Sequence, residues 1–163
     1  MTNDKTQRTT IDWPLLGQWI LASTLGWVVG WILSGDVGVG TVVGITQWLV
    51  LRREIGRAGW WILATAVGWT LGWAVVMAGV IVPPQPDLAG SMLAGAIIGL
   101  IVGLSQWLVL RLAVDQAGWW VLASTIGWAV AMTGMIGWTL SGAAAGALTG
   151  LMLDWLLRFP RQS

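Results

Sequence analysis

The sequence contains no cysteine, no histidine and no tyrosine. The absence of cysteine excludes disulfides, thiol catalysis and cysteine-bound metals. Without histidine, the chain also lacks the commonest general base and the commonest metal ligand. We therefore expect a protein that is not an enzyme, with no catalytic residues and no metal site.

Charge is also scarce. Only 9% of the 163 residues are charged and 56% are apolar, whereas a soluble domain carries about 25% charged residues. The mean hydropathy is +0.77. The net charge of +1 gives no general attraction to nucleic acid. We expect the lipid bilayer to surround this chain and nucleic acid not to be a partner.

The chain divides into six apolar segments, which predict an all-α membrane protein of six transmembrane helices. They cover residues 13–34, 37–51, 60–82, 88–112, 119–140 and 141–157. A bilayer core about 30 Å thick needs roughly 20 helical residues, so the second and sixth segments are short, and a re-entrant hairpin is their alternative. We predict one membrane domain, 13–158, between polar tails 1–12 and 159–163.

Positive charges occupy alternate connections. All eight lie in the two tails and in the second and fourth loops: Lys5, Arg8, Arg52, Arg53, Arg57, Arg111, Arg158 and Arg161. Lysine and arginine in short loops stay on the cytoplasmic side. The pattern therefore predicts an even number of spans, with both termini in the cytoplasm.

An internal repeat accounts for most of the chain. Residues 19–27 (WILASTLGW), 61–69 (WILATAVGW) and 120–128 (WVLASTIGW) match one another, and QWLVLR at 47–52 returns at 106–111 and, diverged, as DWLLR at 154–158. The copies are the hairpins 13–53, 60–112 and 119–158. Because each copy holds two spans, all three point the same way, and we expect a pseudo-threefold bundle of parallel hairpins.

Small residues recur every fourth position, as in Gly-x-x-x-Gly motifs that let membrane helices approach closely. The predicted packing positions are Gly26, Gly30, Gly68, Gly72 and Gly127 in the first helices, and Gly40, Gly44, Gly95, Gly99, Gly103, Gly142, Gly146 and Gly150 in the second helices. The register of the third copy stays open. Asp154 replaces either the stripe tryptophan or the glutamine of the other copies.

Tryptophan is abundant, with 15 residues against a single Phe159. Nine lie near the cytoplasmic boundary and fit an interfacial aromatic belt: Trp13, Trp19, Trp48, Trp60, Trp61, Trp107, Trp119, Trp120 and Trp155. Five lie deeper: Trp27, Trp31, Trp69, Trp73 and Trp128. Their indole N–H groups need partners, for which Ser23, Thr65, Ser124 or a carbonyl are candidates. These rings either pack between helices or line a cavity for a flat apolar ligand, such as a carotenoid, quinone, chlorin or lipid.

The candidate ligand-binding residues are the five deep tryptophans and three polar residues. Gln47 and Gln106 lie about one turn inside the cytoplasmic boundary, where they either bond a neighbouring helix or bind a headgroup or an ion. Asp154 is an acid within a span, which by default suggests a function. Arg158, four residues later, offers it a structural ion pair instead.

The stretch 106–111 (QWLVLR), a short polar linker and 117–124 (AGWWVLAS) resemble a repeat of bacterial multi-pass membrane proteins. The resemblance covers nearly the whole chain and implies the bacterial cytoplasmic membrane, but no activity. We expect a protein that binds an apolar small molecule or lipid, or an accessory subunit packed against other membrane subunits or its own copies. The alternative is a small transporter or channel along the repeat axis, although few polar residues line the middle of the spans.

Overall fold

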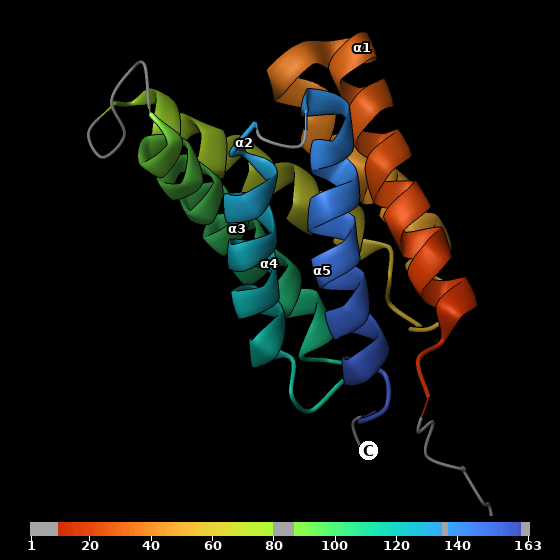
Figure 1. The fold of residues 1–163 in the computed structure, drawn as a ribbon. Coiled ribbons are helices and arrows are strands. Elements are labelled where there is room, and N and C mark those ends of the chain that lie inside the picture. The colour runs from red at the N-terminus through yellow and green to blue at the C-terminus, as the bar shows by residue number, and fades with distance from the viewer. Residues whose placement is uncertain (1–9, 80–86, 135–136, 161–163) are drawn as a thin grey trace, which may run out of the picture.

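The computed structural model describes residues 10–79, 87–134 and 137–160, which form an all-helical bundle (Figure 1). Its elements are α1 (Trp13–Leu51), α2 (Trp60–Met77), α3 (Leu88–Leu110), α4 (Gly118–Ala131), the short 3-10 helix η1 (Trp138–Leu140) and α5 (Ser141–Leu156). The all-α fold predicted from the apolar segments is confirmed.

Helix α1 consists of two helices joined at a kink. Gly35 has φ 55° and ψ −150°, a backbone conformation that glycine adopts readily because it has no Cβ. The two halves, Trp13–Gly35 and Gly38–Leu51, form the first hairpin, so the described residues contain six main helices. The first half begins where the Asp12 side chain accepts the Leu15 N–H at 3.0 Å, a standard N-cap.

Two predicted segments were too long. Helix α2 ends at Met77 and is followed by Gly79 with φ 66°, and α4 ends at Ala131 ahead of Gly134 with φ 70°. A glycine with positive φ is a common helix terminator, so these two glycines shorten the segments predicted at 60–82 and 119–140. The remainder of those predictions at 80–82 and 135–136 lies outside the described residues.

Three of the helices are long and apolar enough to cross a membrane. They are Trp13–Gly35, Trp60–Met77 and Leu88–Leu110, while Gly38–Leu51 and Gly118–Ala131 are apolar but shorter. Large apolar side chains cover the outside of the bundle, and Leu21, Leu63 and Leu122 are 57%, 53% and 47% exposed. An exposed apolar surface of this extent is typical of a face that contacts lipid.

The helices form a closed ring. Each packs against the next along the chain, and α5 returns to pack against α1. The start of α1, the loops 52–59 and 111–117 and the described C-terminal end all lie at one end of the bundle (Figure 1). We call this the arginine end, because it carries Arg52, Arg53, Arg57, Arg111 and Arg158.

The packing glycines of the first helices face the second helix of the same hairpin. A Cβ atom added to Gly68 would lie 2.8 Å from the Cα of Val102, and one added to Gly72 would lie 3.0 Å from the Cα of Ile98. The first distance is shorter than real Cβ contacts and the second is tighter than most of them, so glycine permits these close crossings. Gly127 is looser, because its Cβ would lie 3.5 Å from the nearest atoms.

The glycines of the second helices face the next hairpin around the ring. A Cβ atom would lie 3.1 Å from the Cα of Ile62 if added to Gly44, and 3.1 Å from the Cα of Val121 if added to Gly103. For Gly146, the distance to the Cα of Ile20 would be 3.2 Å. The third hairpin therefore contacts the first hairpin through the same kind of crossing.

Candidate functional site

Six tryptophans meet inside the bundle as two groups of three. Trp19, Trp61 and Trp120, the arginine-end triad, have ring centroids 5.3 to 5.9 Å apart and interplanar angles of 70° to 84°. Each is at most 1% exposed. Edge-to-face pairs of this kind stabilise by about 0.5–1.5 kcal/mol beyond the area they bury.

The second group lies about two helical turns deeper. Trp27, Trp69 and Trp128, the central triad, have centroids 5.0 to 5.6 Å apart and are 1% to 7% exposed. Eight residues separate equivalent members of the two triads in each helix, which is about 12 Å along a helix. The two triads therefore fill the interior at two levels.

The predicted aromatic belt was wrong for the arginine-end triad. Trp19, Trp61 and Trp120 face the interior, whereas Trp60 and Trp119, one residue earlier, are 64% and 53% exposed. Neighbouring residues on a helix point about 100° apart, so only one tryptophan of each pair can face lipid. Interfacial placement fits the exposed members alone.

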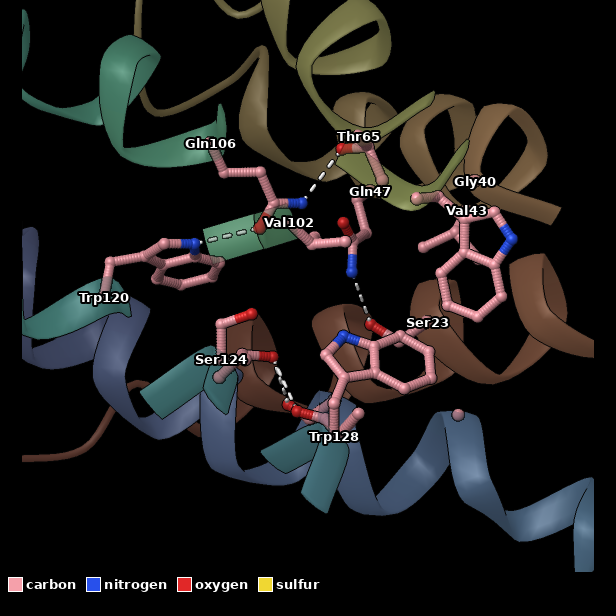
Figure 2. A pocket seen from close by; sticks show the side chains of 15 residues that line it. Ser23, Gly40, Val43, Gln47, Thr65, Val102, Gln106, Trp120, Ser124 and Trp128 are labelled. Atoms are coloured by element: carbon pink, nitrogen blue, oxygen red, sulfur yellow. Dashed lines mark hydrogen bonds between the residues drawn. The ribbon is translucent and has the colours of Figure 1, made fainter. Parts of the chain in front are cut away.

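Gln47 joins three helices through its carboxamide. The Trp61 indole N–H donates to Gln47 Oε1 at 3.0 Å. Gln47 Nε2 in turn donates to Ser23 Oγ at 3.0 Å (Figure 2). Both ends of the buried amide are therefore occupied. The bond to Trp61 links the first hairpin to the second.

Gln106 repeats this arrangement one hairpin later. The Trp120 indole N–H donates to Gln106 Oε1 at 2.9 Å, and Gln106 Nε2 donates to Thr65 Oγ1 at 2.9 Å (Figure 2). This bond links the second hairpin to the third. Both glutamines thus bond neighbouring helices, which was one of their two predicted roles.

Thr149 takes the corresponding place in the third hairpin and was missed by the sequence analysis. The Trp19 indole N–H donates to Thr149 Oγ1 at 3.1 Å, and this hydroxyl donates to the Ala145 carbonyl at 2.7 Å. The bond links the third hairpin back to the first.

The sequence suggested two alignments of the third hairpin with the other two, and the contacts of the third hairpin follow neither of them. A Cβ added to Gly142 would lie 2.8 Å from the Ser23 carbonyl oxygen, and one added to Gly40 would lie 3.0 Å from that of Thr65. Thr149 follows Gly142 by seven residues, as Gln47 follows Gly40. A search for this spacing would have found it. Asp154 therefore replaces neither the tryptophan nor the glutamine.

A small cavity lies between the triads. Its volume is about 20 Å³, and its lining includes six polar residues, which we call the polar layer: Ser23, Gln47, Thr65, Gln106, Ser124 and Thr149. Trp120 from one triad and Trp69 and Trp128 from the other also line it (Figure 2). No charged residue does. The cavity is too small for a flat apolar ligand.

The deep tryptophans form one cluster. The Trp27 N–H donates to the Trp138 carbonyl at 2.9 Å, so a carbonyl and not Ser23 is its partner. Trp31 and Trp73 lie half-buried at the rim, 5.8 and 6.0 Å by ring centroid from Trp138 and Trp69. Their indole nitrogens are buried without a hydrogen-bond partner in the described part of the chain.

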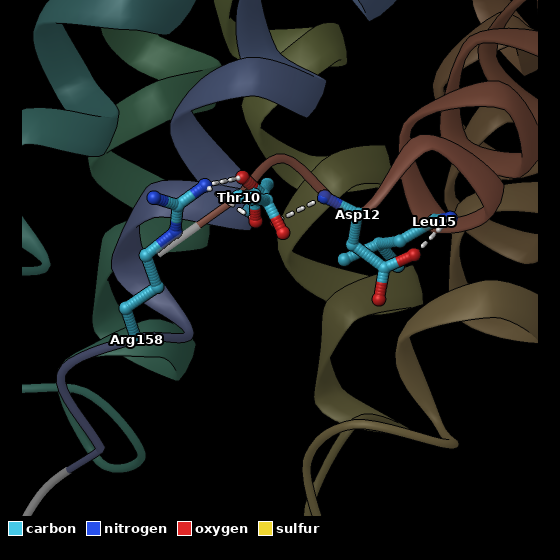
Figure 3. A network of polar contacts seen from close by, with 5 residues as sticks. Thr10, Asp12, Leu15 and Arg158 are labelled. Atoms are coloured by element: carbon cyan, nitrogen blue, oxygen red, sulfur yellow. Dashed lines mark hydrogen bonds and ion pairs between the residues drawn. The ribbon is translucent and has the colours of Figure 1, made fainter. Parts of the chain in front are cut away.

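Asp154 lies away from this cluster, where the chain ends meet. Its buried carboxylate accepts the Asp12 backbone N–H at 3.1 Å and pairs with the Arg158 guanidinium, which also donates to the Thr10 carbonyl at 3.3 Å (Figure 3). The i,i+4 pair predicted from the sequence is confirmed. Asp154 thereby fastens the end of α5 to the start of α1, and it does not join the glutamines.

A groove of about 400 Å³ lies on the outer surface between α2 and α3. Its lining is apolar apart from Ser105 and, at the arginine end, Arg57. Leu63 and Leu108 on its sides are about half exposed. The small side chains of Ala64 and Ser105 stand between these bulky neighbours and leave room for a chain-like apolar molecule.

The first hairpin carries a smaller groove at matching positions, about 240 Å³, whose lining includes Leu21, Leu49, Gln18 and Arg53. There Arg53 donates to Gln18 Oε1 at 3.3 Å. No bond or ion pair holds Arg57 within the part of the chain that the structure describes. Of these two matching grooves, the one between α2 and α3 is the larger, and its arginine has no partner among the described residues.

Comparison with known proteins gives no relative: no family model, no curated protein and no solved structure matches this chain. The assignment of a function rests on the site itself.

Proposed function

We propose that this chain is a bacterial cytoplasmic membrane protein with six spans, built as three parallel hairpins around a pseudo-threefold axis. The repeated sequence supports this, and so do the matching contacts of Gln47, Gln106 and Thr149 with the next hairpin. The gathering of arginines at one end supports cytoplasmic termini, because positive residues stay inside. The short helices are tolerable within a packed bundle flanked by arginine.

Within that architecture the protein is a non-catalytic lipid-binding module. We place the acyl chain of one anionic glycerophospholipid in the α2–α3 groove, with its phosphate at Arg57. The observation that carries this proposal is an apolar groove of about 400 Å³ with Arg57 at its mouth, a size typical of small-molecule sites. Arginine binds phosphate through charge-assisted hydrogen bonds, and anionic lipids are attracted to such residues at the cytoplasmic surface.

The tryptophan triads are structural in this proposal. Their rings contact one another at centroid distances of 5.0 to 5.9 Å and leave a cavity of only about 20 Å³. A carotenoid, quinone or chlorin would have to separate all three hairpins to enter. The same rings occupy the axis at two levels, which weighs against a pathway for ions or solutes along it.

Native mass spectrometry from a mild detergent tests the proposal. We expect one phosphatidylglycerol adduct, retained at collision energies that remove phosphatidylcholine. Leu108→Trp would fill the groove from its exposed side, and Arg57→Gln would remove its charge, so each should remove the preference. Leu49→Trp, at the matching position of the first hairpin, is the control and should retain it.

Equal retention of both lipids, or a preference unaffected by Leu108→Trp and Arg57→Gln, would overturn the lipid site. An absorption spectrum of the same sample shows whether a pigment or quinone is bound instead. A second membrane protein that remains bound in place of lipid would make the chain an accessory subunit. Either result also contradicts the proposal.

A further inference from the structure

The polar layer is incomplete at one of its three positions. In the first two hairpins a glutamine amide spans from the tryptophan of the next hairpin to the hydroxyl of Ser23 or Thr65. In the third hairpin, Thr149 accepts the Trp19 N–H but turns its own proton to Ala145. The threonine side chain is shorter than glutamine and has no amide nitrogen that could donate to Ser124.

Ser124 is left without the partner that Ser23 and Thr65 have. It is 1% exposed. Among the described residues no amide donates to its hydroxyl, whereas Gln47 and Gln106 donate to the hydroxyls of Ser23 and Thr65. A buried hydroxyl without a partner is rare and costly. Ser124 and Thr149 both line the cavity between the triads, so the cavity lies where the third amide is missing.

We propose that this cavity binds a water molecule that takes the place of the third glutamine amide. A water site needs a volume of about 10–15 Å³ and two to four polar partners. The cavity offers about 20 Å³, and its polar lining includes the hydroxyls of Ser124 and Thr149 and the carboxamide of Gln106. The volume therefore suits a water molecule and excludes an organic ligand.

The lining also decides between water and a small cation. No carboxylate lines the cavity, and an uncompensated charge this deep in a bundle is strongly unfavourable. The two triads close the cavity above and below, with members at most 7% exposed. Water is the neutral molecule of this size that both donates and accepts hydrogen bonds.

Thr149→Gln tests this inference because it restores the amide of the other two hairpins. We expect the variant to displace the water, complete the set of bonds and raise the thermal unfolding midpoint in detergent by about 2–4 °C. Thr149→Val is the control. It keeps the size of threonine but leaves the Trp19 N–H unpaired, and it should lower the midpoint.

A crystal structure of the unmodified protein, at a resolution that reveals ordered water, provides a second measurement. We expect one water within hydrogen-bond distance of Ser124, and none there in Thr149→Gln. An empty cavity would overturn the inference, even if the variant failed to fold. The inference would also be overturned if Thr149→Gln lowered the thermal unfolding midpoint as much as Thr149→Val does. Neither result depends on the lipid groove.

Discussion

At the scale of single residues, the glutamines of the polar layer are the most demanding positions. Each has both ends of its carboxamide engaged inside the bundle, and each lies at 3% to 7% exposure. Buried polar groups that lose a partner cost about 1–3 kcal/mol. A single substitution at either glutamine therefore removes the hydrogen-bond partner of two groups at once, one in its own hairpin and one in the next.

We predict that Gln106→Leu destabilises the protein by about 1–3 kcal/mol, because Trp120 and Thr65 both lose a hydrogen bond. Denaturant unfolding in detergent measures this. Combining it with Trp120→Phe should cost less than the sum of the two single variants, since the bond can be lost only once. Strict additivity would show that the bond contributes nothing.

At the scale of helices, glycine decides how closely a pair can cross. A Cβ on Gly68 would meet the Val102 backbone at 2.8 Å, but one on Gly127 would meet Ala145 at 3.5 Å, an ordinary contact distance. The two glycines occupy the same position in their hairpins. The second and third hairpins therefore differ in tightness at otherwise matching crossings.

Gly68→Ala should destabilise the protein by about 1–3 kcal/mol through overpacking. Gly127→Ala should be neutral, or stabilising by up to about 1 kcal/mol, because alanine has the higher helix propensity. Thermal unfolding of the two variants side by side measures the difference. Equal losses for both would mean that the crossing distance does not govern their tolerance.

How much the sequence predicts also becomes clear at the scale of helices. The six helices and their order follow from hydropathy and from breaks such as Gly35. The orientation of each tryptophan pair does not, because lipid is as apolar as the protein interior, so hydropathy cannot tell which of Trp60 and Trp61 is buried. Thr149 was missed because the resemblance of DWLLR to QWLVLR suggested a different register.

At the scale of the whole molecule, the loops and chain end that carry the described arginines lie at one end of the bundle (Figure 1). The absence of native cysteine makes single-cysteine labelling free of background. We expect Ala78→Cys, at the opposite end, to react with a membrane-impermeant maleimide added outside intact cells. Gly56→Cys and Gly118→Cys, in or beside the arginine-end loops, should react only after the membrane is permeabilised.

All three positions are exposed, so reactivity depends on which side of the membrane each one faces. Labelling of Gly56→Cys and Ala78→Cys from the same side would mean that α2 does not cross the bilayer. The pair therefore tests whether α2 crosses the bilayer between the second and third connections.

The bond from Trp19 to Thr149 joins residues 130 positions apart. During synthesis the first helix enters the membrane long before the ribosome reaches residue 149. Until the last hairpin is inserted, the Trp19 N–H lacks its Thr149 acceptor. The side of the first hairpin that will contact α5 also stays open. The nascent chain must therefore remain as an unclosed arc, held by its first two hairpins, until α5 is inserted. A chain truncated before α5 would present that open side to any neighbouring membrane protein.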